Sequence, residues 1–157
     1  MNIHLQERTE THVKIYSQKA QASEIKKYLP QKAKTLEEAL ADFQKTLSPN
    51  AKSYGKTIYI NDQYIGDIWC YAIDLSETPN AMISYCIFEK KFHNQGIATK
   101  ALALFMKEIF TKFPFKTLGA FTFASNIASI KVLEKNRFQH RETIEENGTV
   151  SFYFQYE

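Results

Sequence analysis

The sequence predicts an α+β domain in which helices flank a mixed, mostly antiparallel sheet. Apolar residues at helical spacing dominate residues 10–47. Three apolar segments separated by short polar turns then lie between residues 56 and 88, as expected of successive strands in one sheet. From residue 81 onward, strand and helix alternate before a closing hairpin, and this order places parallel and antiparallel strands in the same sheet.

The first part of the chain is expected to contain one short strand and two helices. Residues 3–8 alternate weakly between apolar and polar and are expected to form an edge strand. Residues 10–29 are expected to be helical until Pro30, which lacks the N–H that a helix interior needs. Thr35 is a good N-cap for the next helix, since two glutamates follow in its first turn. The apolar stripe of that helix, which we interpret as a packing surface, comprises Leu36, Leu40, Phe43 and Leu47.

Three strands are predicted next, at residues 56–60, 64–73 and 81–88. Polar residues at 61–63 form the turn between the first two, and a loop at 77–80 precedes the third. The third strand is so rich in apolar residues that we expect both of its faces to be buried.

A charged bend joins the third strand to a helix predicted at residues 96–111. The first N–H groups of a helix have no internal acceptor, and the helix dipole adds partial positive charge there. Gly96 lets a ligand approach this backbone without meeting a Cβ atom. The segment is therefore a candidate anion site, although the phosphate motifs GxxxxGK[ST] and GxGxxG are both absent from it.

The C-terminal part is predicted to contain one more strand, one helix and a hairpin. Residues 118–123 form an apolar strand, and the helix begins after Asn126. Residues 138–144 and 150–156 alternate as antiparallel strands, joined by a turn at 145–148.

Length and composition predict one domain spanning residues 1–157. With 44% apolar and 24% charged residues, the composition is that of a globular protein. No apolar run approaches the ~20 residues of a membrane span, and the N-terminus has mixed charge and no hydrophobic segment. We therefore expect a cytoplasmic protein with no membrane partner.

The charge and the cysteines exclude other classes of function. The net charge of +3 is small and the lysines are scattered, which favours a solvated surface and leaves an RNA-binding domain as a weak alternative. We expect no nucleic-acid partner. Cys70 and Cys86 lie inside predicted strands and have neither metal-ligand nor CxxC spacing, so we interpret them as packed free thiols and expect no metal.

Three segments resemble one enzyme family. The segment HNQGIATKAL resembles the acetyl-CoA loop of GCN5-related N-acetyltransferases (GNAT), whose pattern is Gln/Arg-x-x-Gly-x-Gly/Ala. Gly96 and Ala98 fit that pattern, while His93 stands where glutamine or arginine is usual. The segment YIGDIWCYAID (residues 64–74) resembles the Ile-Gly strand of the branch that contains ribosomal-protein N-terminal acetyltransferases.

The third segment, NIASIKVLEKNRF, resembles the second signature of the family. Asn126, Ser129 and Phe138 match it, and Arg137 occupies the usual glycine position. The three segments follow in the family's order over roughly the C-terminal two-thirds of the chain.

The resemblance implies the GNAT fold and a binding mode for acetyl-CoA as co-substrate. In that fold strands 81–88 and 118–123 run parallel and splay apart, and the pantetheine arm pairs with exposed strand backbone. The pairing would fall on Cys86, Ile87 and Phe88. The loop and the following helix would supply the rest of the cofactor site, namely His93, Asn94, Gln95, Gly96, Ile97, Ala98, Thr99, Asn126 and Ser129.

The resemblance also implies an N-acetyltransferase that moves the acetyl group to a primary amine, either a peptide N-terminus or a small amine, by direct attack in a ternary complex. Asn126 and Ser129 are the expected catalytic residues, with Ser129 as proton donor to the thiolate because the position of the family's tyrosine holds Leu133. In some relatives a glutamate in the strand before the asparagine acts as the general base, and the matching position in this chain is Phe121. The remaining base candidates are Asp67, Asp74, Glu89, Glu142 or a water chain.

The acceptor pocket is expected between the N-terminal helices and the strands that follow. Its aromatic lining would comprise Tyr28, Trp69, Tyr71 and Tyr85, residue types that are also common in a core. An α-amino group, with a pKa near ~7.7–8.0, needs little help from a base and is favoured over lysine. A homodimer through the C-terminal strands is a further expectation. The alternative function is a GNAT-fold module that binds acyl-CoA or a protein without turnover.

Overall fold

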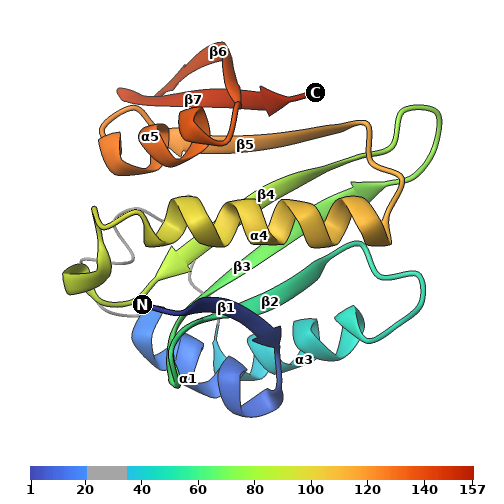
Figure 1. The fold of residues 1–157 in the computed structure, drawn as a ribbon. Coiled ribbons are helices and arrows are strands. Elements are labelled where there is room, and N and C mark those ends of the chain that lie inside the picture. The colour runs from blue at the N-terminus through green and yellow to red at the C-terminus, as the bar shows by residue number, and fades with distance from the viewer. Residues whose placement is uncertain (21–34) are drawn as a thin grey trace.

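The computed structural model of the chain describes residues 1–20 and 35–157 (Figure 1). In these ranges one mixed sheet has the strand order β1-β2-β3-β4-β5-β7-β6. Every neighbouring pair is antiparallel except β4 and β5, which are parallel. The strands are β1 (Ile3–Glu7), β2 (Tyr54–Ile60), β3 (Gln63–Asp74), β4 (Asn80–Ile87), β5 (Thr117–Phe123), β6 (Gln139–Glu146) and β7 (Thr149–Tyr156). The helices are α1 (Glu10–Ala20), α3 (Leu36–Thr46), the 3-10 helix η1 (Lys90–Phe92), α4 (Ile97–Lys112) and α5 (Ile127–Lys135).

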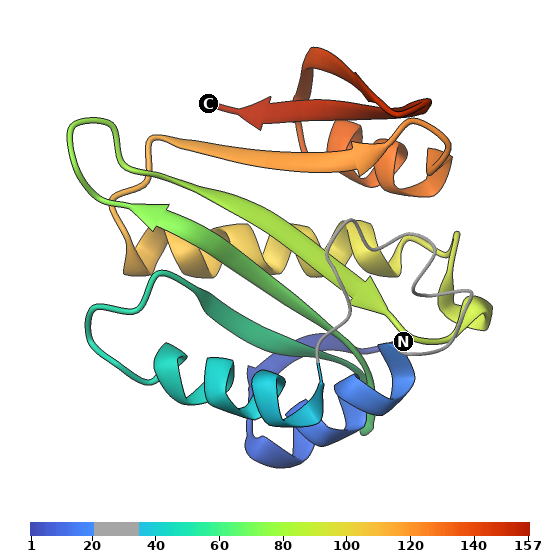
Figure 2. The same ribbon diagram turned by 180° about the vertical axis from the view of Figure 1, so that it is seen from behind.

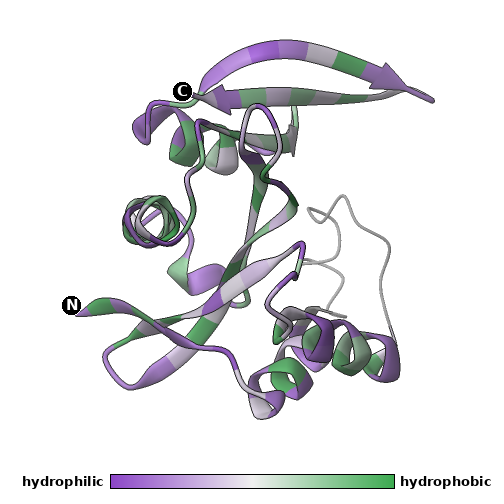
Figure 3. Ribbon diagram, turned by 90° about the vertical axis from the view of Figure 1, so that its right-hand side faces the viewer, coloured by the Kyte–Doolittle hydropathy of each residue, from purple (hydrophilic) through white to green (hydrophobic). Residues whose placement is uncertain are grey.

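The helices cover the two faces of the sheet unequally. Helix α4 runs along one face, while α1 and α3 lie against the other, as the views from behind and from the side show (Figures 2 and 3). The main core lies under α4, where Leu102, Phe105 and Ile109 are fully buried against the sheet. These contacts fix the start of α4 beside the ends of β4 and β5, which positions the site described below.

The N-terminal elements confirm most of the sequence predictions. Strand β1 is an edge strand paired with β2, and Thr35 caps α3 in a reciprocal capping box with Glu38. The predicted stripe on α3 is only partly a packing surface, because Phe43 is buried but Leu36 and Leu47 are exposed. The first predicted helix is observed as α1, and the remainder of that prediction, from residue 21 to Pro30, lies outside the described residues.

Two connections differ from the predictions in detail. The bend before α4 contains the short helix η1, which was not predicted. The hairpin between β6 and β7 turns over two residues rather than four, because Asn147 and Gly148 both take left-handed backbone angles, with φ of 51° and 81°. Such a turn matches the twist of the strands on either side, so β6 extends to Glu146 and β7 begins at Thr149.

The parallel pair β4–β5 is joined at only one end. Pairing joins Asn80 to Thr117, Ala81 to Leu118 and Met82 to Gly119, and then stops, although both strands continue. This confirms that the two strands splay. Gly119 stands at the branch point, where a Cβ atom would lie 2.7 Å from the Met82 sulfur. Glycine thus leaves room for the Met82 side chain at the point where the strands part.

Other features of the described residues bear on the earlier expectations. Cys70 and Cys86 are buried free thiols, as predicted. No helix in the described ranges is long and apolar enough to cross a membrane.

The end of α5 places a residue other than glycine in a left-handed conformation. Arg137 has φ of 69°, its N–H donates to the Glu134 carbonyl, and the Phe138 N–H donates to the Leu133 carbonyl. This is the Schellman pattern, in which glycine is preferred at the position of Arg137. We expect Arg137→Gly to stabilise the protein by about 1 kcal/mol, measured by chemical denaturation. Arg137→Ala is the control, since it removes the guanidinium but keeps the left-handed Cβ; an equal gain in both variants would contradict the conformational explanation.

Candidate active site

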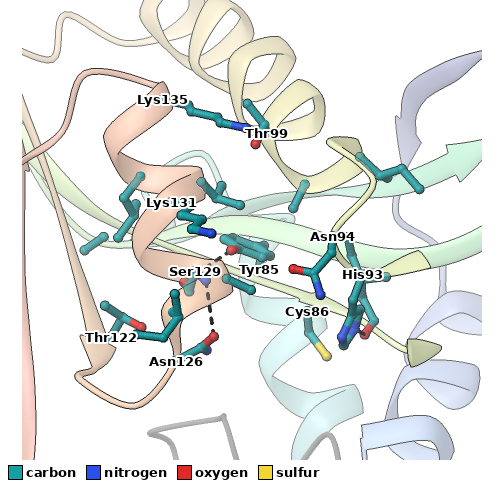
Figure 4. A pocket seen from close by; sticks show the side chains of 18 of the residues that line it. Tyr85, Cys86, His93, Asn94, Thr99, Thr122, Asn126, Ser129, Lys131 and Lys135 are labelled. Atoms are coloured by element: carbon teal, nitrogen blue, oxygen red, sulfur yellow. Dashed lines mark hydrogen bonds between the residues drawn. The ribbon is translucent and has the colours of Figure 1, made fainter. Parts of the chain in front are cut away.

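The splayed strands open into a cavity of about 960 Å³. Its walls come from β4, β5, the beginning of α4 and the helix α5 (Figure 4). Residues far apart in the chain meet there, with Tyr85 and Cys86 on one strand, Thr122 on the other and Ser129 on the helix beyond. A gap between two parallel strands leaves backbone groups unpaired, so an extended polar ligand can pair with them.

The edge of β4 that faces the gap can be assigned from its hydrogen bonds. The Phe88 N–H donates to the Ile65 carbonyl of the neighbouring strand, at 2.9 Å. Because successive peptide groups of a strand point to opposite edges, Ile87 and Tyr85 direct theirs toward the gap, whereas Cys86 and Phe88 direct theirs toward β3. Of the three residues predicted to pair with pantetheine, only Ile87 therefore offers its backbone to the gap.

The loop before α4 is shaped to receive an anion. Asn94 and Gly96 both take left-handed angles, with φ of 60° and 77°, and Gly96 is the N-cap of α4 without a side-chain cap. Alternating backbone conformations of this kind turn several N–H groups into one concave surface. The first turn of α4 adds its own free N–H groups and the positive end of the helix dipole. A Cβ atom at Gly96 would meet nothing within 4 Å, so its φ accounts for the glycine.

Two side chains of this loop brace it from within. The His93 ring donates from Nε2 to the Ile87 carbonyl, at 3.1 Å, which assigns its tautomer because a carbonyl only accepts. The Gln95 amide donates to the Lys91 carbonyl. His93, Asn94, Gly96, Ile97, Ala98 and Thr99 all line the cavity, whereas Gln95 and Phe88 do not. Phe88 instead packs under α1 with Tyr16 and Tyr64.

A chain of three polar side chains lies at the inner end of the cavity. The Asn126 Oδ1 accepts from the Ser129 N–H at 3.2 Å, so Asn126 caps α5. The Tyr85 hydroxyl donates to the Ser129 Oγ at 3.2 Å (Figure 4). Burial raises the pKa of Tyr85 to about 12, which keeps this hydroxyl protonated at neutral pH. Sequence reasoning placed Tyr85 with the acceptor and did not connect it to Ser129, because the contact joins two elements that lie 44 residues apart in sequence.

Three lysines that sequence reasoning missed also line the cavity. They are Lys90 from η1 and Lys131 and Lys135 from α5. Lys131 and Lys135 are four residues apart and therefore share a helix face. In Figure 4 they extend from α5, and Lys135 reaches the first turn of α4 at Thr99. Their i, i+4 spacing after Asn126 is the signal that could have revealed them.

The other predicted acceptor residues do not reach this cavity. Trp69 and Tyr71 do not line it. Both lie on β3, which β4 separates from the gap, and Trp69 packs edge-on against Tyr16 of α1, with ring centroids 6.0 Å apart. That they line an acceptor pocket stays a prediction. Tyr28 lies outside the described residues.

None of the four carboxylates considered as a base lines the cavity. Asp74 accepts from Ser76 in the loop after β3, Glu89 pairs with Lys91 at 3.3 Å, and Glu142 is exposed on the edge strand β6. Within residues 1–20 and 35–157, no group of three or more His, Cys, Asp or Glu side chains could hold a metal ion.

The fourth carboxylate, Asp67, belongs to a buried cluster behind β4. It is 1% exposed, accepts from the Tyr64 hydroxyl at 2.5 Å and pairs with the Arg8 Nε at 3.0 Å. Asp67 is also the cross-strand partner of Cys86, against which Tyr16 of α1 packs. The cluster therefore ties α1 to the strand that forms one wall of the cavity.

The Asp67 carboxyl predicts an unusual pH dependence of stability. Burial raises its pKa from 3.8 to about 6, although Arg8 and Tyr64 act in the opposite direction. The folded protein therefore holds this proton more tightly than the unfolded chain, and the stability from this group rises as pH falls through about 6. Relative to Asp67→Asn, the free energy of unfolding of the unmodified protein should increase by up to about 3 kcal/mol between about pH 7 and about pH 4. Denaturant titrations of both proteins measure this difference, and a difference that stays constant or falls would contradict the assignment.

Comparison with known proteins bears on the fold and the family. Residues 2–139 match the acetyltransferase (GNAT) domain family. No curated protein sequence matches the chain significantly. Several solved structures do resemble it, and in each case the likeness covers almost the whole of this chain.

One such structure is RimL, a ribosomal L7/L12 alpha-N-protein acetyltransferase in complex with coenzyme A; it is 21% identical, with 99% of this chain and 94% of that chain covered and a TM-score of 0.82. A second, from Salmonella typhimurium, is an acetyltransferase that modifies the N-terminal serine of ribosomal protein L7/L12; it is 19% identical, with 99% and 95% covered and a TM-score of 0.81. A third is the aminoglycoside acetyltransferase AAC(6')-Ib with coenzyme A, 16% identical, with 99% and 94% covered and a TM-score of 0.80. At these identities the likeness shows a shared fold.

Proposed function

The chain belongs to the GNAT family of acetyltransferases, and from this premise we propose that it acetylates the α-amino group of a peptide or small amine at the gap between β4 and β5. It is an acetyl-CoA-dependent N-acetyltransferase. The observation that supports the location is the cavity itself, in which unpaired strand backbone leads to the anion-binding loop before α4. We also propose that the described ranges form a single catalytic domain.

The residues present fit acetyl-CoA from one end to the other. The diphosphate would lie on the N–H groups between Asn94 and Thr99, with Lys131 and Lys135 near enough to add positive charge. The pantetheine arm would pair with the free edge of β4 at Ile87 and Tyr85. The Ile87 carbonyl already accepts a hydrogen bond from the His93 ring. To pair with pantetheine, it would either accept a second hydrogen bond or lose the one from His93.

The polar chain at the inner end suits the chemistry of acetyl transfer. An amine attacks the thioester carbonyl, and the negative charge that develops on its oxygen needs a donor, for which a gap-facing backbone N–H of β4 is available. The departing thiolate would take a proton from the Ser129 hydroxyl, and Ser129 would take one from the Tyr85 hydroxyl. Tyr85 would in turn regain its proton from the water that accepts one from the attacking amine. Asn126 holds the first turn of α5 and with it the position of Ser129.

The proton of the attacking amine has no carboxylate acceptor among the described residues that line the cavity. An α-amino group, with a pKa near ~7.7–8.0, is partly neutral at cellular pH and can lose its proton to water, whereas a lysine amine is almost fully charged. This supports an α-amino acceptor. RimL and the Salmonella enzyme act on such a group, and AAC(6')-Ib is named for acetylation of aminoglycosides. Cytoplasmic location and a homodimer stay predictions.

A thiol-release assay tests the proposed function. The purified protein is incubated with acetyl-CoA and a panel of peptides and small amines, and free CoA is measured. We expect release that depends on an α-amine and follows its deprotonation over about pH 6.5–8.5. Binding of acetyl-CoA without release on any amine would instead favour the alternative, a GNAT-fold binding module.

A further inference from the structure

The acceptor end of the cavity carries an apolar surface that the transfer reaction itself does not require. Phe121 and Ile127 are exposed to 44% and 57%, and both line the cavity. The other large apolar side chains of comparable exposure in the described ranges, Leu36, Leu47, Leu75 and Met1, do not line it. Exposed apolar side chains at the mouth of a polar site mark a place where a ligand makes contact.

The sheet places Phe121 on the side of the gap away from the anion-binding loop. Ala120, its neighbour on β5, is in the core under α4, and side chains alternate along a strand. Phe121 therefore lies on the face of α1 and α3, where its ring packs against Tyr153 of β7 at a centroid distance of 5.2 Å. That packing fixes the Phe121 ring at the wall of the cavity, which Ile127 of α5 also lines.

The charges around the cavity disfavour polycationic acceptors. Among the described residues that line it there is no Asp or Glu, while Lys90, Lys131 and Lys135 are all present. A polycation such as an aminoglycoside or a polyamine would bring additional ammonium groups into a site that offers them no counter-charge. The phosphates of the co-substrate would neutralise the lysines at the far end, but the inner end around Tyr85, Ser129 and Phe121 is uncharged.

From these observations, and resting on the proposed function, we infer that the acceptor is an α-amine whose own carbon bears an apolar side chain, which packs against the exposed side chains of Phe121 and Ile127. Phe121 is thus a specificity-determining residue. The amine would then point toward Ser129 and the thioester, while the rest of the peptide leaves through the open mouth.

The test is the ranking of acceptors and its dependence on Phe121. Tripeptides that differ only in their first residue (leucine, alanine, glycine, lysine or aspartate), together with spermidine and kanamycin, are compared by kcat/KM at fixed acetyl-CoA. We expect the leucine peptide to exceed the lysine and aspartate peptides by about tenfold or more, and both polycations to be poorer still. Phe121→Ala should remove most of the leucine preference, so that the ratio of kcat/KM for the leucine peptide to kcat/KM for the glycine peptide falls toward one.

Two further variants sharpen this test. Phe121→Glu should raise kcat/KM for the lysine peptide relative to that for the leucine peptide, because the new carboxylate supplies the missing counter-charge. Leu75→Ala is the matched control, because Leu75 is 51% exposed but does not line the cavity, and it should leave the ranking intact. The inference is overturned if a polycation is the best acceptor or if Phe121→Ala leaves the leucine preference in place. Release of CoA with a different ranking would refute only the inference, whereas absence of release on every amine would refute the proposed function as well.

Discussion

Replacing Gly66 by alanine should abolish acetyl-CoA binding and destabilise the fold by about 3 kcal/mol or more. A Cβ atom at this position would lie 2.1 Å from the Cys86 carbonyl oxygen and 3.0 Å from the Ile87 Cα. Both are backbone atoms, so no rotation of a side chain relieves the clash. Strand β4 would have to move away from β3 at the residues that form the wall of the cavity. Denaturant unfolding and calorimetric titration with acetyl-CoA measure the two effects.

Gly55→Ala is the matched control for that substitution. Gly55 lies in the same sheet on β2, and the nearest contact of its added Cβ would be the Trp69 Cβ at 3.1 Å. The position of the Trp69 Cβ is fixed by its own backbone, so β2 and β3 must shift apart by a few tenths of an ångström. This is far less than Gly66→Ala demands, so we expect a loss of stability of about 1 kcal/mol and normal binding. If Gly66→Ala changed stability and acetyl-CoA binding as little as Gly55→Ala, the close approach of β3 to β4 would not be required for either property.

Removing the Ser129 hydroxyl should have the largest effect on the rate. For Ser129→Ala we expect kcat to fall about 100-fold, since a positioned proton donor contributes a factor of that order. Affinity for acetyl-CoA should change little, because the backbone of α5 and the loop before α4 are untouched. Steady-state kinetics with a fixed α-amine acceptor, together with calorimetry, separate these two outcomes.

Tyr85→Phe and the double variant test whether the two hydroxyls act together. The Tyr85 hydroxyl donates to the Ser129 Oγ, so its removal should lower kcat by a smaller factor and have little further effect once Ser129 is alanine. Independent, multiplying effects would show that Tyr85 does not act through Ser129. An unchanged kcat in Ser129→Ala would remove Ser129 from the proposed mechanism altogether.

The features that the sequence predicted well are those that depend on local chemistry. The capping box at Thr35, the helix that begins after Gly96 and the cap at Asn126 each require only a few neighbouring residues. The splay of β4 and β5 was also anticipated, but from the resemblance to the GNAT family and not from the spacing of residues.

The features that the sequence missed depend on how strands are arranged across the sheet. The strand that carries Trp69 lies one place away from the gap and its side chain faces α1, which the local sequence does not reveal. The hydrogen bond between Tyr85 and Ser129 and the proximity of Lys135 to the first turn of α4 join residues that only the tertiary fold brings together. The backbone direction of Ile87, as opposed to Cys86, follows from the register with β3, which composition does not reveal.

A crystal structure of the protein with acetyl-CoA tests the central claim most directly. The account predicts the co-substrate in the gap between β4 and β5, with its diphosphate within hydrogen-bonding distance of the N–H groups between Asn94 and Thr99 and its thioester beside Ser129. Density for the co-substrate anywhere else, with the two strands paired along their full length, would contradict it.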